Sequence, residues 1–229
     1  MSRLAELIRR AARDETPPMG FAARANWKPA PRMLTVATGP AEDADLLLLA
    51  APASAKQQTP WGVTVRDAAG YRAAREAGAD FVCFAMDDLP AQVLLDEEPG
   101  RVLVLDQDTP DALLRMVEGL GVDACYVERA DGPLTVRAAA ELRRIAGLTR
   151  RPLLLPATVA PDTGELGAAR ECGVVGLVVP PVTAAAVRER IAAVPARKPR
   201  REERPMAVLP HAGFAPANEE EEDDEDRLR

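Results

Sequence analysis

Eight short apolar segments lie along the middle of the chain, and most of them are apolar throughout instead of alternating with polar residues. Such segments are typical of strands in parallel sheets that helices cover on the outer side. Helical patterns separate most of the later segments, so that strand and helix alternate. The expected strands are residues 33–38, 45–50, 61–65, 81–86, 102–106, 124–128, 152–157 and 174–179, and the expected helices are 68–77, 89–95, 110–120, 135–146, 163–172 and 183–193. This alternation predicts a parallel α/β fold.

A short motif recurs before the even-numbered strands. It reads Gly-Ala-Asp at 78–80, Gly-Val-Asp at 121–123 and Gly-Val-Val at 173–175, and Asp-Ala-Asp at 43–45 is a version without the glycine. Each glycine follows a helical pattern and suits the left-handed position that ends a helix. Because the motif marks every second strand, the repeating unit is two strand–helix pairs. Such a repeat favours a barrel built from quarters over an open Rossmann sheet.

The segment that runs from Ala74 through Ala77, Gly78, Ala79 and Asp80 to Val82 resembles the helix-to-strand joints of aldolase-type TIM barrels. The resemblance covers roughly residues 33–194. It rests on features shared by the whole superfamily, so it indicates no single family within it. The resemblance implies a (β/α)8 barrel.

The first two connections are too short for the helices of such a barrel. Only residues 39–44 join the first two strands, and residues 51–60, which contain two prolines, join the second and third. A parallel crossover normally takes a dozen or more residues. We therefore predict an α/β fold of a compact, degenerate (β/α)8 TIM-like barrel with the first two helices reduced or missing. If the first two strands instead form an antiparallel hairpin, the alternative is an open parallel α/β sheet.

Three regions follow from these patterns. Residues 1–32 are expected to form an N-terminal helix and an irregular lead-in, residues 33–194 the barrel, and residues 195–229 a disordered linker and acidic tail. The N-terminal helix is charged and lacks the apolar segment of a secretory signal, and no apolar run is long enough to span a membrane. We therefore expect a cytoplasmic protein with no membrane partner.

Composition excludes several functions. The net charge is −7 and aromatic residues make up 3% of the chain, which argues against a nucleic-acid partner. His211 is the only histidine and lies in the expected tail, so the barrel holds no Ser–His or Cys–His pair and no histidine-based metal site. No glycine-rich nucleotide motif occurs, and no lysine lies on an expected strand. A cofactor cannot be named, and Mg²⁺ bound weakly by carboxylates is the only metal that the residues suggest.

The active site of a TIM barrel lies at the C-terminal ends of the strands. Three acidic residues there are candidate catalytic groups: Asp106, Glu128 and Asp87. Clustered carboxylates can raise one another's pKa for acid–base work. The candidate substrate-binding residues are Arg66, Asp67, Arg129, Thr158 and Thr183. These acids have a competing structural interpretation, in which Asp87 or Asp88 caps the helix near residue 89 and Asp108 caps the helix that begins at residue 110.

Two functional hypotheses remain open at this point. The first is a small-molecule-binding TIM-like barrel that acts as a lyase or isomerase on a small anionic metabolite through its strand-end carboxylates. The second is a non-catalytic barrel used for binding or assembly. An open polar pocket at the mouth would favour the enzyme, and a mouth filled by leucines or prolines would favour the second hypothesis. The missing helices also predict an apolar flank at the first two strands, covered either by a second copy of the chain in a homo-oligomer or by the apolar segment 206–214.

Overall fold

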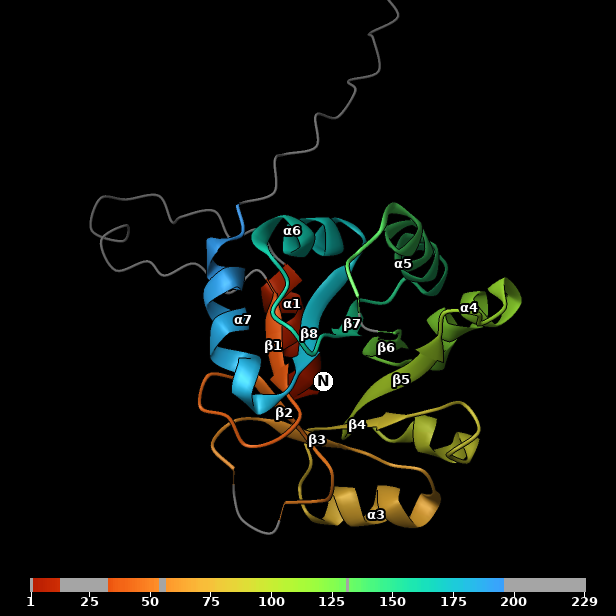
Figure 1. Cartoon of the computed structure of the whole chain (residues 1–229). Coiled ribbons are helices and arrows are strands. Elements are labelled where there is room, and N and C mark those ends of the chain that lie inside the picture. The colour runs from red at the N-terminus through yellow and green to blue at the C-terminus, as the bar shows by residue number, and fades with distance from the viewer. Residues whose placement is uncertain (1, 13–32, 54–56, 131, 196–229) are drawn as a thin grey trace, which may run out of the picture. The chain divides into compact units, whose positions relative to one another are not determined.

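Eight parallel strands pair with their neighbours in chain order and close into a barrel, as Figure 1 shows. The computed structural model describes residues 2–12, 33–53, 57–130 and 132–195. The strands are β1 (Leu34–Ala37), β2 (Leu46–Leu49), β3 (Trp61–Thr64), β4 (Phe81–Phe84), β5 (Gly100–Asp106), β6 (Ala124–Glu128), β7 (Leu153–Pro156) and β8 (Val174–Val179). The predicted barrel is confirmed. The open-sheet alternative is wrong, because β1 pairs with both β2 and β8 in parallel.

The helices cover only part of the ring. They are α1 (Arg3–Ala12), α3 (Ala68–Glu76), α4 (Asp111–Val117), α5 (Val136–Thr149), α6 (Thr163–Glu171) and α7 (Pro181–Ala193), with the 3-10 helices η1 (Ala91–Leu95) and η2 (Glu118–Leu120). No helix lies between β1 and β2 or among the described residues between β2 and β3, as the short connections predicted. The predicted helix after β4 is only the 3-10 helix η1.

A short parallel crossover is feasible here because the strands themselves are short. Each of β1 and β2 has four residues, which corresponds to a rise of about 13 Å. The connection 38–45 has to return over that height, and eight extended residues reach up to about 29 Å. The connection therefore needs no helix to bring β2 beside β1 in the same direction.

The short connections also cover the flank that was expected to be apolar and exposed. Leu47 on β2 is 3% exposed, and Ala41 and Ala53 from the two connections pack against the same outer core. The described residues of β1 and β2 carry no large apolar side chain that is strongly exposed. Oligomerisation through this flank stays a prediction.

The barrel interior forms a core of its own, closed at the N-terminal end by α1. Leu4, Ile8 and Ala11 of α1 pack with the side chains that point into the barrel. Phe81 is the largest of these that is fully buried, and it fills the space beside Gly62. Figure 1 shows α1 behind the strand ring, near β1 and β8. A second apolar layer lies between the strands and the surrounding helices.

The recurring sequence motif has a structural role in strand pairing. We call Asp45, Asp80 and Asp123 the aspartate clips. Each carboxylate accepts a hydrogen bond from the backbone N–H of a residue on or next to the preceding odd strand, and its own N–H donates to the carbonyl of that same residue at 2.8 Å. The partners are Thr35 at 2.8 Å for Asp45, Trp61 at 2.9 Å for Asp80 and Arg101 at 2.9 Å for Asp123.

The last quarter of the barrel has Val175 where the other three have the clip aspartate. There the Leu153 N–H donates to the Gly173 carbonyl, and the register of β7 and β8 shifts between Leu153 and Leu154. The motif glycines behave as predicted, since Gly78, Gly121 and Gly173 all have positive φ. The register shift therefore falls at the quarter that lacks the clip.

Several expectations concern residues outside the described part of the chain. They are the lead-in after residue 12 and the acidic tail from residue 196. Among the described helices, none combines the length and the apolar character needed to cross a bilayer.

Candidate functional site

Two of the predicted catalytic residues meet at the C-terminal mouth of the barrel. Asp106 ends β5, Glu128 ends β6, and the two are paired in the register of these strands. Both side chains are exposed. They line an open, polar depression of about 610 Å³. Its other lining residues are Gln107, Asp108, Tyr126, Arg129, Ala130 and Pro156.

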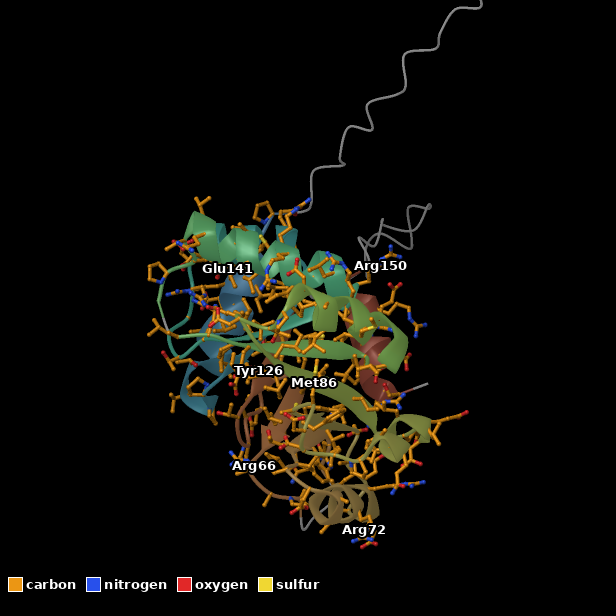
Figure 2. The ribbon with its side chains drawn as sticks, turned by 90° about the vertical axis from the view of Figure 1, so that its right-hand side faces the viewer. Arg66, Arg72, Met86, Tyr126, Glu141 and Arg150 are labelled. Carbon is orange, nitrogen blue, oxygen red and sulfur yellow. The ribbon has the colours of Figure 1, made fainter. Side chains whose placement is uncertain are left out.

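Strand alternation explains how these side chains come together. Tyr126 and Glu128 are two residues apart on β6, so both point to the inner side of the barrel. Tyr126 packs against the interior core and lines the depression below Glu128. Figure 2 shows Tyr126 inside the strand ring, and Arg66 apart from it on the α3 side. Sequence reasoning missed Tyr126, although its spacing from Glu128 was a usable signal.

The loop after β5 is held from outside the barrel. The Arg144 guanidinium on α5 donates to the carbonyls of Gln107 at 2.7 Å and Thr109 at 3.4 Å and forms an ion pair with Asp111. Thr109 donates back to the Asp106 carbonyl through both its N–H and its hydroxyl. These contacts place Asp106 and Asp108 at the mouth without using their carboxylates.

The mouth carries a surplus of negative charge. Asp106, Asp108 and Glu128 contribute three carboxylates, and among the described lining residues Arg129 is the single cation. Within the described residues, none of the three carboxylates has a hydrogen bond or ion pair. All their acceptor capacity is therefore directed to solvent or to a ligand.

A second cavity lies beside the mouth, outside the strand ring. It has about 320 Å³, and its walls come from β7, from α6 and from the loops that follow β6 and β7. Predicted residues Arg129 and Thr158 line it together with Leu134, Leu155, Leu166, Ala169 and Leu177. The Glu165 carboxylate in the first turn of α6 accepts the Leu134 N–H at 2.7 Å, which joins the loop after β6 to α6 beside the cavity. Sequence reasoning missed this apolar cavity.

The structure separates the remaining predicted residues from both cavities. Arg66 is exposed after β3, and Asp87 is exposed in the turn after β4. Asp67 caps α3, because its carboxylate accepts the Gly70 N–H at 2.7 Å. The Thr183 hydroxyl donates to the Pro180 carbonyl at 3.0 Å in the first turn of α7.

Neither Asp88 nor Asp108 caps the helix that follows it, so the cap interpretation is wrong for both. Asp88 accepts the Ala85 N–H at 2.8 Å and so closes the turn after β4 instead of capping a helix. Asp108 does not cap α4, whose N-cap is Pro110 without a side-chain hydrogen bond. Asp108 is thereby left at the mouth.

The cysteine thiols are not nucleophiles in this fold. Burial raises the pKa of Cys83 to about 12 and that of Cys125 to about 12, and it also raises the pKa of Cys172. The thiols therefore stay protonated at neutral pH, and the thiolate is the reactive form. In the part of the chain that the structure describes, no three histidine, cysteine or acidic side chains converge as a metal site would require.

Comparison with known proteins supports the fold and goes no further. No protein-family model and no curated protein matches the sequence. Among solved structures, a mutant tryptophan synthase α-subunit from Pyrococcus furiosus is 15% identical with a TM-score of 0.51, and the match covers 70% of this chain and 97% of that one. The orotidine 5'-phosphate decarboxylase from Pyrococcus horikoshii is 14% identical with a TM-score of 0.50, covering 69% and 99%.

The closed ring of eight parallel strands and these two likenesses define the class of fold. The chain folds as a closed (β/α)8 TIM-like barrel, as its helix-to-strand joints predicted. At identities this low, function has to be argued from the site itself.

Proposed function

We propose that this protein binds a small molecule with a positively charged group at the mouth of the barrel, between β5 and β6. The observation that carries the proposal is the pair Asp106 and Glu128, which are neighbours in register, exposed, and unpaired within the described residues. A cationic group placed between them gains charge-assisted hydrogen bonds to both carboxylates.

The charge at the mouth favours a cation over the anionic metabolite expected from sequence. An anion would need several cationic or hydrogen-bond-donating groups, and the sequence suggested Arg66, Arg129 and Thr183 for that role. Arg66 and Thr183 do not line the mouth, which leaves Arg129 against three carboxylates. The three carboxylates repel a negatively charged group, so an anion is a poor ligand for the depression.

An acid–base enzyme is the second candidate, and the same pair of carboxylates supports it. Neighbouring carboxylates can divide the roles of proton donor and acceptor, as lyase or isomerase chemistry requires. The depression is open to water, however, and the interior below it is filled by Tyr126 and the core. Binding therefore ranks ahead of catalysis, because exposure to water weakens electrostatic catalysis.

Calorimetry with small amines tests the proposal. Putrescine and agmatine should bind the full chain at low ionic strength, and malonate should not. The double variant Asp106→Asn, Glu128→Gln should lose at least about tenfold in amine affinity, the effect of one charge-assisted hydrogen bond. Glu76→Gln, Glu189→Gln is the matched control, because it removes two exposed acids elsewhere and changes the net charge equally.

Equal losses in the two double variants would refute the proposal, since attraction by net charge would then explain the binding. Proton NMR of a bound amine in D₂O tests the second candidate. If the carboxylates act as bases, a C–H signal should exchange away with the wild-type protein and persist with the double variant.

A further inference from the structure

The cavity outside the strand ring is mainly apolar, and its inner walls are formed by core residues. Leu166 on α6 is fully buried, and Leu155 on β7 and Leu177 on β8 are each 3% exposed. These side chains point outward from the strands or inward from the helix, so the cavity lies between sheet and helix. At about 320 Å³ it falls in the size range of sites that take small ligands. A single aromatic ring or a branched alkyl group suits its volume and its walls.

Arg129 lies at the junction of this cavity and the polar mouth. It lines both, as does Pro156. The Arg129 Nη2 donates to the carbonyls of Gly132 at 3.2 Å and Pro133 at 3.3 Å, which holds the guanidinium against its own loop. Its Nε and Nη1 make no hydrogen bond within the described residues. A guanidinium held through one nitrogen keeps its remaining donors available for a carboxylate.

Three different binding groups therefore lie next to one another across the ends of β5, β6 and β7. They are two carboxylates at the mouth, a guanidinium at the junction, and an apolar cavity beyond it. We propose that the ligand is an amino acid with an apolar side chain. Its ammonium lies between Asp106 and Glu128, its carboxylate on Arg129, and its side chain in the cavity. The ammonium contact rests on the function proposed above, whereas the other two contacts are independent of it.

Simpler ligands satisfy only part of this arrangement. An apolar amine leaves the Arg129 donors without a partner, and an apolar acid leaves the two carboxylates without one. Glycine has no side chain, so it leaves the cavity empty and makes no contact with its apolar walls. Because a site with polar groups arranged for a ligand discriminates against analogues that lack their partners, the complete amino acid should bind best.

A panel of four compounds separates the contacts by calorimetry on the full chain. L-phenylalanine carries all three groups, 2-phenylethylamine lacks the carboxylate, 3-phenylpropanoate lacks the ammonium, and glycine lacks the side chain. Phenylalanine should bind at least about tenfold more tightly than each of the other three. Equal affinity of phenylalanine and 2-phenylethylamine would overturn the role of Arg129.

Two variants test the contacts separately. Arg129→Gln should reduce phenylalanine affinity to that of 2-phenylethylamine, and Arg188→Gln, an exposed arginine on α7, is the matched control. Ala169→Leu places three extra carbons in the cavity wall, so it should weaken phenylalanine and 2-phenylethylamine and leave glycine unchanged. If Ala169→Leu does not fold, saturation-transfer NMR on the wild-type protein replaces it, and the ring protons should then saturate more strongly than the α proton.

The outcomes distinguish this inference from the proposed function. If 2-phenylethylamine binds and Asp106→Asn, Glu128→Gln abolishes its binding, the cationic site stands. The amino-acid inference then fails if Arg129→Gln leaves the affinity for phenylalanine unchanged. It fails equally if Ala169→Leu leaves that affinity unchanged or, where NMR replaces this variant, if the ring protons saturate no more strongly than the α proton. If 3-phenylpropanoate binds as tightly as phenylalanine and no amine responds to the double variant, the proposed function fails and the site is one for apolar acids.

Discussion

The aspartate clips should stabilise the barrel measurably, and Asp123 is the most informative of them. Its Oδ2 accepts two hydrogen bonds, from the Arg101 N–H at 2.9 Å and from the Ser2 hydroxyl at 2.9 Å. Ser2 in turn accepts the Ala5 N–H at the start of α1. Asp123 thus links the start of β5 to the helix that closes the N-terminal end of the barrel. The change to make is Asp123→Ala.

The expected cost follows from the groups that lose their partner. Ser2 is 5% exposed, and the Arg101 N–H lies at the edge of the barrel core, so water replaces the carboxylate poorly at both. Leaving one buried donor unpaired costs about 1–3 kcal/mol. For the two donors together we expect a loss of roughly 2–4 kcal/mol in the free energy of unfolding. Asp123→Asn keeps an oxygen in place and should cost less than half of that.

Urea denaturation followed by far-ultraviolet circular dichroism measures this loss. The urea concentration at the midpoint should fall. The slope of the unfolding free energy against urea concentration should stay constant, because the surface that becomes exposed on unfolding does not change. Asp43→Ala is the control, since Asp43 lies two residues before the clip aspartate Asp45 and is exposed. If Asp123→Ala and Asp43→Ala agree within about 0.5 kcal/mol, the usual range for surface substitutions, the clip has no energetic role and the reasoning is wrong.

Three further predictions concern the core and the outer shell. Leu4→Ala should cost about 2–5 kcal/mol in the same denaturation assay, because Leu4 is fully buried against the barrel interior, and an unchanged midpoint would contradict the closing role of α1. Gly62→Ala should cost at least about 1–3 kcal/mol, because the new Cβ would lie 2.5 Å from the Phe81 carbonyl oxygen and would also meet the Phe81 ring; a neutral result would mean that β3 shifts freely. The pKa of Tyr71 is raised from 10.0 to about 12 by burial, by its hydrogen bond to Asp96 and by the charge of that carboxylate. The stability that Tyr71 contributes is therefore full below pH 10 and is lost as the pH rises through 12, so Tyr71→Phe should abolish that part of the decline in an unfolding titration by circular dichroism.

Most of the fold was predictable because it depends on local patterns. Continuous apolar segments mark strands buried on both sides, and a glycine after a helix marks the left-handed end at Gly78, Gly121 and Gly173. The short first connections correctly indicated missing helices. The pattern at 89–95 predicted a helix over the whole segment, but only the 3-10 helix η1 forms there.

The candidate site was predictable only in part. Strand ends can be located from sequence, which identified Asp106, Glu128 and Arg129. The sequence could not show that Asp67 would cap α3, because that hydrogen bond depends on the backbone geometry at Gly70. Pro110 begins α4 without help from Asp108, which leaves that carboxylate at the mouth.

The sequence by itself determined the positions of the strands, their helix-to-strand joints and the repeat that became the aspartate clips. These features depend on contacts between residues close in the chain or between adjacent strands. Only the tertiary structure decided which strand ends share a site, because the register of β5 and β6 sets Asp106 beside Glu128, whereas Arg66 follows β3 and does not line the mouth. It alone created the apolar cavity, which exists because α6 and the loops after β6 and β7 pack around a space that no side chain fills.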